Sequence, residues 1–144
     1  MRVAGFGEIM LRLSTNKGVM ISNTNNYNVN YGGGEANVLI SLSKFGIDTN
    51  MITKVSNNDI GEGIISYLNS HKVNTSQVQK DEGRTGIYFL EVGSGNRNSK
   101  VIYDRNNSCF SNMKVSDINI EEVLTDIDIF HFSGITLALS EEIR

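Results

Sequence analysis

A run of three glycines, Gly32 to Gly34, followed at once by a helical pattern is the feature that most constrains this chain. Glycine has no Cβ, so backbone or a small molecule can approach the main chain closely. Apolar and small residues recur at helical spacing after the run, and Gly46 is a natural stop. The first N–H groups of such a helix lack partners within it. The pattern therefore predicts either a tight strand-to-helix turn or a small-ligand site that includes the Asn37 amide.

Composition restricts the classes of protein that fit. The chain has 144 residues, room for about one domain, and an apolar fraction of 39% that can form a core. The net charge is −3 and no basic patch stands out, which argues against a nucleic acid partner. No apolar run is long enough to span a membrane, and the N-terminus does not resemble a signal peptide. The single cysteine, Cys109, cannot form an internal disulfide, so we expect a cytoplasmic protein.

Strand and helix patterns alternate in the first half of the chain. We expect strands over residues 2–6 and 49–55, each followed by a helix, with the second helix capped by Asn57, Asn58 or Asp59. This order is typical of a parallel sheet with helical crossovers. Residues 10–14 either continue the first strand or turn away from it, and residues 19–21 form a possible short strand that could pair with residues 28–31.

The second half predicts a hairpin and a further strand. Residues 85–92 and 100–105 are two strand-like runs joined by a flexible loop. Ser116 or Asp117 is expected to cap a short helix that ends near residue 124, and residues 127–132 form another strand. A capped helix begins at Ser140 and extends for about one turn, too short to cover the sheet. We therefore expect the front part of a larger α/β protein; the alternative is a small complete α/β domain.

Three motifs point to a known family: Gly7-Glu8 after the first strand, Gly32-Gly33-Gly34-Glu35-Ala36-Asn37, and Lys54-Val55-Ser56-Asn57-Asn58-Asp59-Ile60-Gly61. On these motifs the whole chain resembles the N-terminal part of the PfkB family of carbohydrate kinases. The resemblance implies an α/β, ribokinase-like fold across residues 1–144, with a partial parallel sheet flanked by helices. It also implies a small β lid built from residues of about 15–31 and 84–106. Leu39 and Ser56 depart from the family's first signature, which puts helix packing and the shape of one loop in question.

Within that family the chain is most similar to 2-keto-3-deoxygluconate kinases. The similar stretches are residues 7–14, 85–91, 101–105 and 132–136. Many sugar kinases of this fold carry an Asp near Arg12, but no acidic residue stands between Glu8 and Glu35 here. This absence argues against a ribose or adenosine kinase. The alternatives are a fructokinase or another PfkB sugar kinase and, from a different class, a non-catalytic sugar-binding or oligomerising module.

The expected hairpin suggests how a sugar acid could be held. Tyr103 and Arg105 share a strand face, as do Gly86 and Tyr88, so two phenols and a guanidinium could converge above the glycine strip. A guanidinium suits a carboxylate because its planar fork makes two parallel charged hydrogen bonds. The resemblance implies that substrate is contacted by Gly33, Gly34, Tyr88, Tyr103 and Arg105, and that Asn37 lies where the family contacts sugar. The alternative is an ordinary cross-strand tyrosine pair beside a solvated arginine.

The resemblance also implies what lies outside this chain. Family members transfer the ATP γ-phosphate with Mg²⁺ and an Asp of a Gly-Ala-Gly-Asp motif. That motif is not in this sequence, so we expect no catalytic residue here and neither ATP nor Mg²⁺ bound to the chain alone. The family's lid often pairs with another subunit, which implies a homodimer through the lid. His71, His131 and Cys109 are expected to have structural roles, with no metal site.

Overall fold

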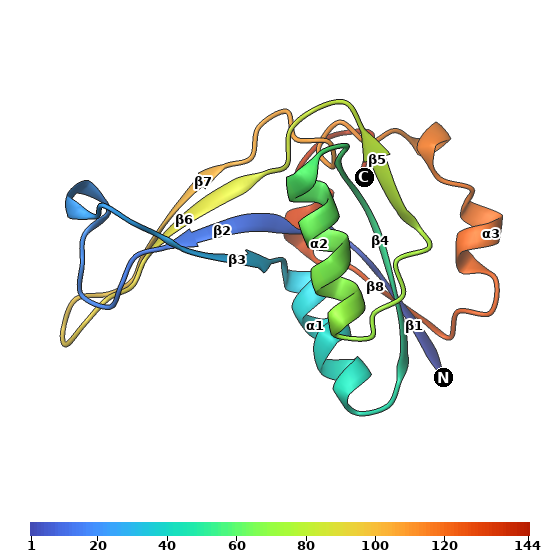
Figure 1. The fold of residues 1–144 in the computed structure, drawn as a ribbon. Helices are drawn as coiled ribbons and strands as arrows, with labels where there is room; N and C mark the ends of the chain where they lie inside the picture. The colour runs from blue at the N-terminus through green and yellow to red at the C-terminus, as the bar shows by residue number, and fades with distance from the viewer.

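A parallel sheet forms the main layer of the protein, and the computed structural model describes all residues from 1 to 144 (Figure 1). The strand order is β5-β4-β1-β8. These strands are β1 (Arg2–Phe6), β4 (Asp48–Ser56), β5 (Val78–Asp81) and β8 (Ile129–His131). Two helices, α1 (Gly34–Lys44) and α2 (Asp59–Ser70), cover one face of the sheet. The alternation of strands and helices that the sequence predicted is therefore confirmed, although β5 was not anticipated.

The core between the sheet and these helices follows from alternation along the strands. Met51 and Val55 of β4 point toward α1 and α2, where they join Leu39 and Leu68 in one buried cluster. Leu39 packs directly over Gly5, where an added Cβ would come within 2.8 Å of its Cδ1. The departure from the family signature at Leu39 is thus accommodated by a glycine in the strand beneath it.

Both long helices end or begin where the sequence predicts. Gly46 has a φ of +80°, a left-handed conformation that favours glycine, and it follows the last turn of α1. Asn58 is the N-cap of α2, because its side-chain oxygen accepts hydrogen bonds from the N–H groups of Ile60 at 3.0 Å and Gly61 at 3.3 Å. Asn58 is therefore the cap among the three candidates.

A second sheet, here called the lid, projects from one end of the parallel sheet (Figure 1). Its strand order is β3-β2-β6-β7, with β2 (Met10–Ser14), β3 (Asn28–Gly32), β6 (Ile87–Glu91) and β7 (Lys100–Asp104). The lid starts earlier than predicted, because residues 10–14 turn away from β1 and enter it. Residues 19–21 are not a strand; Ile21–Asn23 form a short 3-10 helix, η1, and β3 pairs with β2 instead.

The segment after the hairpin differs most from expectation. A 3-10 turn, η2 (Val115–Asp117), precedes α3 (Ile120–Leu124), and Asn119 rather than Ser116 or Asp117 caps α3. Asp117 is not available as a cap because its carboxylate accepts from Lys54 and from the N–H of Lys114. A short helix, α4 (Gly134–Leu137), follows β8, and residues 141–143 form a turn instead of the expected helix. No helix combines the length and apolar character that crossing a membrane requires.

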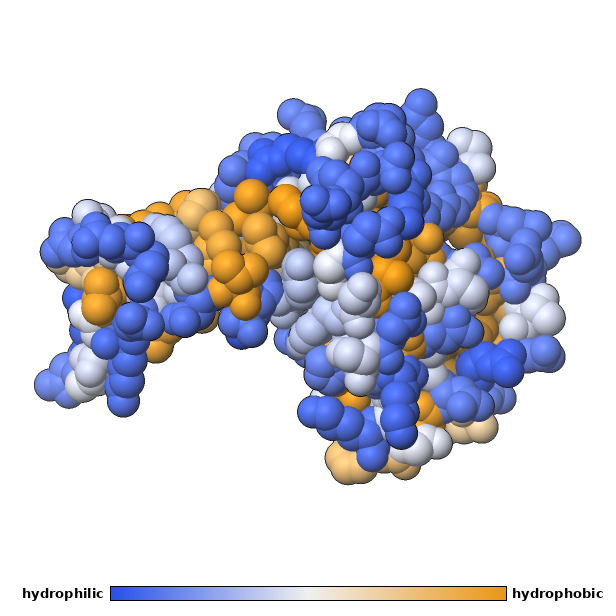
Figure 2. Space-filling view, viewed as in Figure 1, coloured by the Kyte–Doolittle hydropathy of each residue, from blue (hydrophilic) through white to orange (hydrophobic).

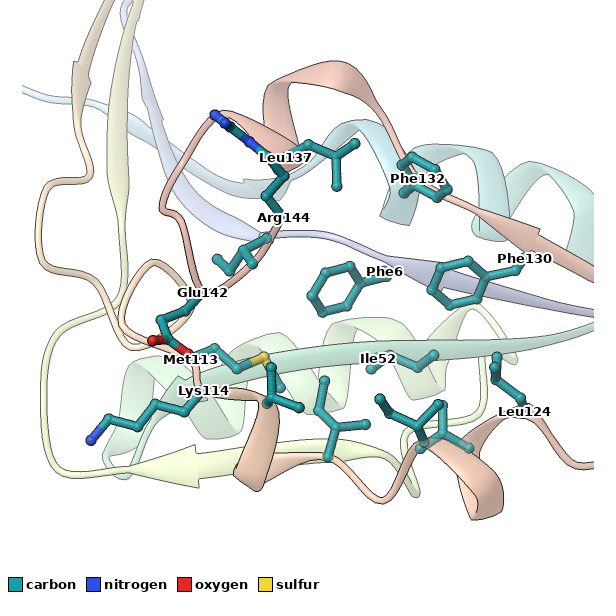
Figure 3. Close-up of a pocket in the computed structure, with 15 residues that line it drawn as sticks. Phe6, Ile52, Met113, Lys114, Leu124, Phe130, Phe132, Leu137, Glu142 and Arg144 are labelled. Carbon is teal, nitrogen blue, oxygen red and sulfur yellow. The ribbon is translucent and has the colours of Figure 1, made fainter.

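The face of the sheet opposite α1 and α2 carries an apolar groove of about 430 Å³ (Figure 3). Phe6 and Phe130 lie side by side on its floor, with ring centroids 6.3 Å apart. Ile52 of β4 continues the floor and Val123 of α3 packs against it. This face carries only α3, the turns around it and the last residues of the chain, of which Leu137 and Ile143 also line the groove, so the sheet is fully covered on one side alone.

Candidate functional site

The candidate site lies where β1 ends. From β1 the chain passes to β4 and β5 on one side, and later to β8 on the other. In open parallel sheets, ligands bind outside the carboxyl ends of the strands at such a switch in direction. Gly7 and Glu8 follow β1 at this point, and the glycine strip lies against them, because a Cβ on Gly33 would collide with the Glu8 carbonyl oxygen. Two of the three sequence motifs therefore meet here.

The three glycines of the strip serve different purposes. The Glu8 main chain excludes a side chain at Gly33, whereas a Cβ on Gly32 would come within 2.6 Å of the Tyr88 hydroxyl and would require that side chain to shift. Gly34 is exposed and has nothing within 4 Å of an added Cβ. No side chain caps α1, which starts at Gly34, and Asn37 is exposed one helical turn later. The Gly34 main chain and the Asn37 amide are therefore accessible together.

The lid carries the predicted aromatic pair above this strip. Tyr88 on β6 lies opposite Tyr103 on β7, with ring centroids 5.9 Å apart, and residues paired in this way share one sheet face. Tyr88 extends its hydroxyl toward Gly32, and the guanidinium carbon of Arg105 lies 5.8 Å from the centre of the Tyr103 ring. The structure thus places all three side chains on the face that meets the strip. Their contact with a substrate stays a prediction.

The Arg105 guanidinium is mostly buried, and one of its edges is already paired within the protein. Its Nε donates to Oε2 of Glu8 at 2.7 Å, and its Nη2 pairs with the same oxygen. The Glu8 side chain is 2% exposed and the Arg105 side chain 15%. No protein group accepts a hydrogen bond from Nη1. Sequence reasoning missed Glu8 as a partner, although its position directly after β1, at the switch point, was a usable signal.

A second guanidinium lies on the same lid face. Arg12 on β2 is opposite Tyr88 and also opposite Asn30 of β3, so the four strands present a row of polar and aromatic side chains. The Nε of Arg12 is buried and has no hydrogen-bond partner. From the sequence alone, this region was notable only for the absence of an Asp.

Glu35 fastens the start of α1 to the turn after β8. Its Oε1 accepts from the N–H of Ser133 at 2.9 Å and from the Thr136 hydroxyl at 2.7 Å, and the residue is buried. Burial alone would raise the pKa of the carboxyl, but the hydrogen bonds from Ser133 and Thr136 outweigh it and lower the pKa below its ordinary value. A Cβ on Gly7 would collide with the same carboxylate. Glu35 therefore fixes the glycine strip against the end of β1.

The Lys54–Gly61 motif holds the neighbouring loop. Lys54 pairs with Asp81 at 2.6 Å and Asp117 at 2.9 Å, which joins β4, β5 and η2. Burial works against the charge of the ammonium, but the hydrogen bonds to both carboxylates raise the pKa of Lys54 overall. The Ser56 hydroxyl donates to Asn58 at 2.8 Å and lies 2.6 Å from the Thr85 hydroxyl. Ser56 thus ties the loop to the base of the lid.

The remaining reactive side chains have structural surroundings. Cys109 is buried, and burial raises the pKa of its thiol. His71 packs against Tyr67, with ring centroids 4.6 Å apart and the ring planes tilted by 54°. No group of three or more His, Cys, Asp or Glu side chains is arranged to hold a metal ion.

Comparison with known proteins identifies the family. Residues 2–144 match the family described as pfkB family carbohydrate kinase. The chain belongs to the PfkB family. A 2-dehydro-3-deoxygluconokinase from Thermotoga maritima has a solved structure that superimposes with a TM-score of 0.95 at 44% identity, covering 99% of this chain and 44% of that one. A 2-dehydro-3-deoxygalactonokinase from Haloferax volcanii is 31% identical over 96% of this chain and 43% of its own length.

A third relative bears on the nucleotide. A sugar kinase from Pyrococcus horikoshii, solved in complex with ATP, is 27% identical with a TM-score of 0.82, covering 90% of this chain and 42% of that one. PfkB sugar kinases are ATP-dependent phosphotransferases. The ribokinase-like α/β fold with its small lid is therefore confirmed for this PfkB chain, which spans less than half the length of these relatives.

Proposed function

We propose that this chain forms the sugar-acid-binding part of an ATP-dependent kinase whose acceptor is 2-keto-3-deoxygluconate. The observation that carries the proposal is the Arg105 guanidinium, which lies beside Tyr103 on the lid face above the glycine strip with Nη1 unpaired. A keto acid has a carboxylate that this group would bind through charged hydrogen bonds, whereas a simple ketose has none. The relatives from Thermotoga maritima and Haloferax volcanii are named for acids of this kind.

The other residues would hold the sugar hydroxyls. Gly34 offers open main chain at the start of α1, and Asn37 offers an exposed amide one turn later. Tyr88 and Tyr103 provide phenolic hydroxyls on the opposite wall. ATP and Mg²⁺ would be used by the whole protein, and the Gly-Ala-Gly-Asp motif that supplies the family's catalytic Asp does not occur in these 144 residues. We therefore expect this chain alone to bind the acid without phosphorylating it.

The test replaces Arg105 with alanine in the intact kinase and measures affinity by calorimetry. Loss of charged hydrogen bonds worth about 1.5–3 kcal/mol should weaken 2-keto-3-deoxygluconate binding by roughly 10- to 150-fold. Binding of ATP should stay unchanged. Arg84→Ala is the matched control, because Arg84 pairs with Asp104 on the surface of the same region. An equal loss for acid and nucleotide would contradict the carboxylate role of Arg105.

A panel of substrates distinguishes this proposal from the alternative functions. The intact protein should phosphorylate 2-keto-3-deoxygluconate in preference to fructose and ribose, because only the acid engages Arg105. The C4 epimer, 2-keto-3-deoxygalactonate, has the same carboxylate and belongs in the same panel. A preference for fructose would favour a fructokinase, and no phosphorylation of any sugar would favour a binding module.

We further propose that the lid mediates a homodimer through its other face. The row Val29, Leu13, Phe89 and Ile102 runs across all four strands by register. Val29 is 61% exposed and Ile102 41%, and Figure 2 shows hydrophobic surface over the lid. Exposed apolar patches of this kind mark interaction surfaces. Ile102→Lys should lower the molar mass measured by light scattering to that of a monomer, while Val115→Lys, also at an exposed apolar residue but outside the lid, should not.

A further inference from the structure

We propose that Glu8 is a positioning residue for the sugar-acid site: its buried carboxylate fixes one edge of the Arg105 guanidinium so that the opposite edge meets the substrate carboxylate. This inference rests on the proposed function, because it assigns a role to Glu8 only if an acid binds at Arg105. Glu8 does not touch the substrate in this arrangement. It acts through Arg105.

The position of Glu8 makes it a rigid support. It follows β1, and its backbone carbonyl lies so close to Gly33 that a Cβ there would collide with it. Its carboxylate is almost fully buried, and Oε2 receives both Nε and Nη2 of Arg105. A long arginine side chain on an exposed strand end would otherwise sample many rotamers. Glu8 removes that freedom before any ligand arrives.

Gly86 provides the space that the carboxylate needs. A Cβ on Gly86 would collide with Oε1 of Glu8 and come within 3.2 Å of the Cβ of Arg105. Gly86 precedes β6 and lies two residues before Tyr88, on the same face. Glu8, Gly86 and Arg105 thus come from three separate segments and form one unit, in which the glycine is required by the ion pair and not by a turn.

The charge of the pair also directs the ligand. Glu8 and Arg105 together are neutral, so the pair can lie mostly buried without an unpaired charge. A second carboxylate is repelled from the edge that Glu8 occupies and finds donors only at the Nη1 side. Recognition of the acid therefore depends on the orientation of the guanidinium, and removal of Glu8 should weaken binding even though it leaves an uncompensated positive charge.

The experiment is a double-mutant cycle in the intact protein, with 2-keto-3-deoxygluconate affinity measured by calorimetry. Glu8→Ala should weaken binding about tenfold, the lower end of the loss seen when a residue that orients a metal-binding side chain is removed. In the Arg105→Ala background the same change should have less than about a twofold effect, because Glu8 then has nothing to position. Glu8→Gln, which keeps an acceptor for Nε, should recover part of the affinity. Asp104→Asn is the control, since Asp104 is the last residue of β7 and directly precedes Arg105 but pairs with Arg84.

A second variant distinguishes loss of positioning from misfolding. Gly86→Ala keeps both charged groups but displaces the Glu8 carboxylate, and it should reproduce the loss seen for Glu8→Ala with a preserved thermal transition. Full additivity of Glu8→Ala and Arg105→Ala, or unchanged affinity in Glu8→Ala and Gly86→Ala, would overturn the positioning role while leaving acid binding intact. If the wild-type protein bound fructose but not the acid, the proposed function would fail, and this inference with it.

Discussion

Glu35 offers the sharpest test of how the glycine strip is held in place. Its carboxylate accepts two hydrogen bonds, from the Ser133 N–H at 2.9 Å and from the Thr136 hydroxyl at 2.7 Å. Hydrogen bonds to a charged group contribute about 1.5–3 kcal/mol each, and neutral ones about half of that. Glu35→Gln keeps an acceptor oxygen but loses the charge, so the free energy of unfolding should fall by about 2 kcal/mol. Glu35→Ala leaves both donors without a partner and should cost about 3–5 kcal/mol.

The dependence of this effect on pH provides a second measurement. The pKa of Glu35 in the folded protein lies below its ordinary value of 4.5, so its contribution to stability is complete above the unfolded pKa. It is lost as the pH falls through the folded pKa, because the protonated carboxyl no longer offers charged acceptors. Urea unfolding at pH 7 should therefore separate wild type from Glu35→Gln, and the difference should shrink toward pH 3.

A matched control exists in the other long helix. Glu62 lies in the first turn of α2, as Glu35 does in α1, but it is exposed and pairs with Lys80 on the surface. Glu62→Gln should change the free energy of unfolding by less than about 1 kcal/mol. The reasoning would be refuted if Glu35→Gln destabilised no more than Glu62→Gln, or if its effect stayed constant from pH 7 to pH 3.

Three other changes have defined outcomes. Gly34→Ala should keep or slightly raise the melting temperature, because alanine favours helix more than glycine and meets no neighbour, yet it should weaken sugar binding measured by calorimetry. Lys54→Met should cost about 1–2 kcal/mol in urea unfolding at pH 7, since it leaves Asp81 and Asp117 facing each other. That cost should decline below pH 4, because the ammonium holds the pKa of Asp81 below the ordinary 3.8 and, together with the Lys114 N–H, which acts more strongly there, also that of Asp117. Cys109 should react with a thiol reagent far more slowly in the folded protein than in urea, because burial raises the pKa of its thiol.

Local patterns in the sequence were sufficient for most of the parallel layer. The spacing after the glycine run, the stop at Gly46 and the cap at Asn58 depend on residues within a few positions of each other. The pairing of Tyr88 with Tyr103 followed from the alternation of two strands that are consecutive in the sequence and joined by residues 92–99. In these cases the residues that decide the structure are close together in the sequence, so their spacing was sufficient to predict it.

The misplaced elements have a common physical origin. Residues 10–14 alternate as well as those of β1, and nothing within them says that the backbone leaves one sheet for another at Gly7 to Ile9. The cap of α3 moved to Asn119 because Asp117 is held by Lys54, 63 residues earlier. Local helix propensity does not account for an ion pair with a residue as distant in the sequence as Lys54. Such competition is resolved only when the strands assemble.

The same separation explains why the site was only half visible in the sequence. Glu8 and Arg105 are 97 residues apart, and Glu35 and Thr136 are 101 apart, yet each pair holds a segment next to the glycine strip. Two of the neighbouring glycines leave the space that these carboxylates occupy: Gly7 for Glu35 and Gly86 for Glu8. An added Cβ on Gly34, in contrast, would meet no atom of the protein within 4 Å. Because Gly34 also lies one helical turn from the exposed Asn37 amide, we expect the ligand to approach the main chain there, beside the two segments that the buried carboxylates hold in place.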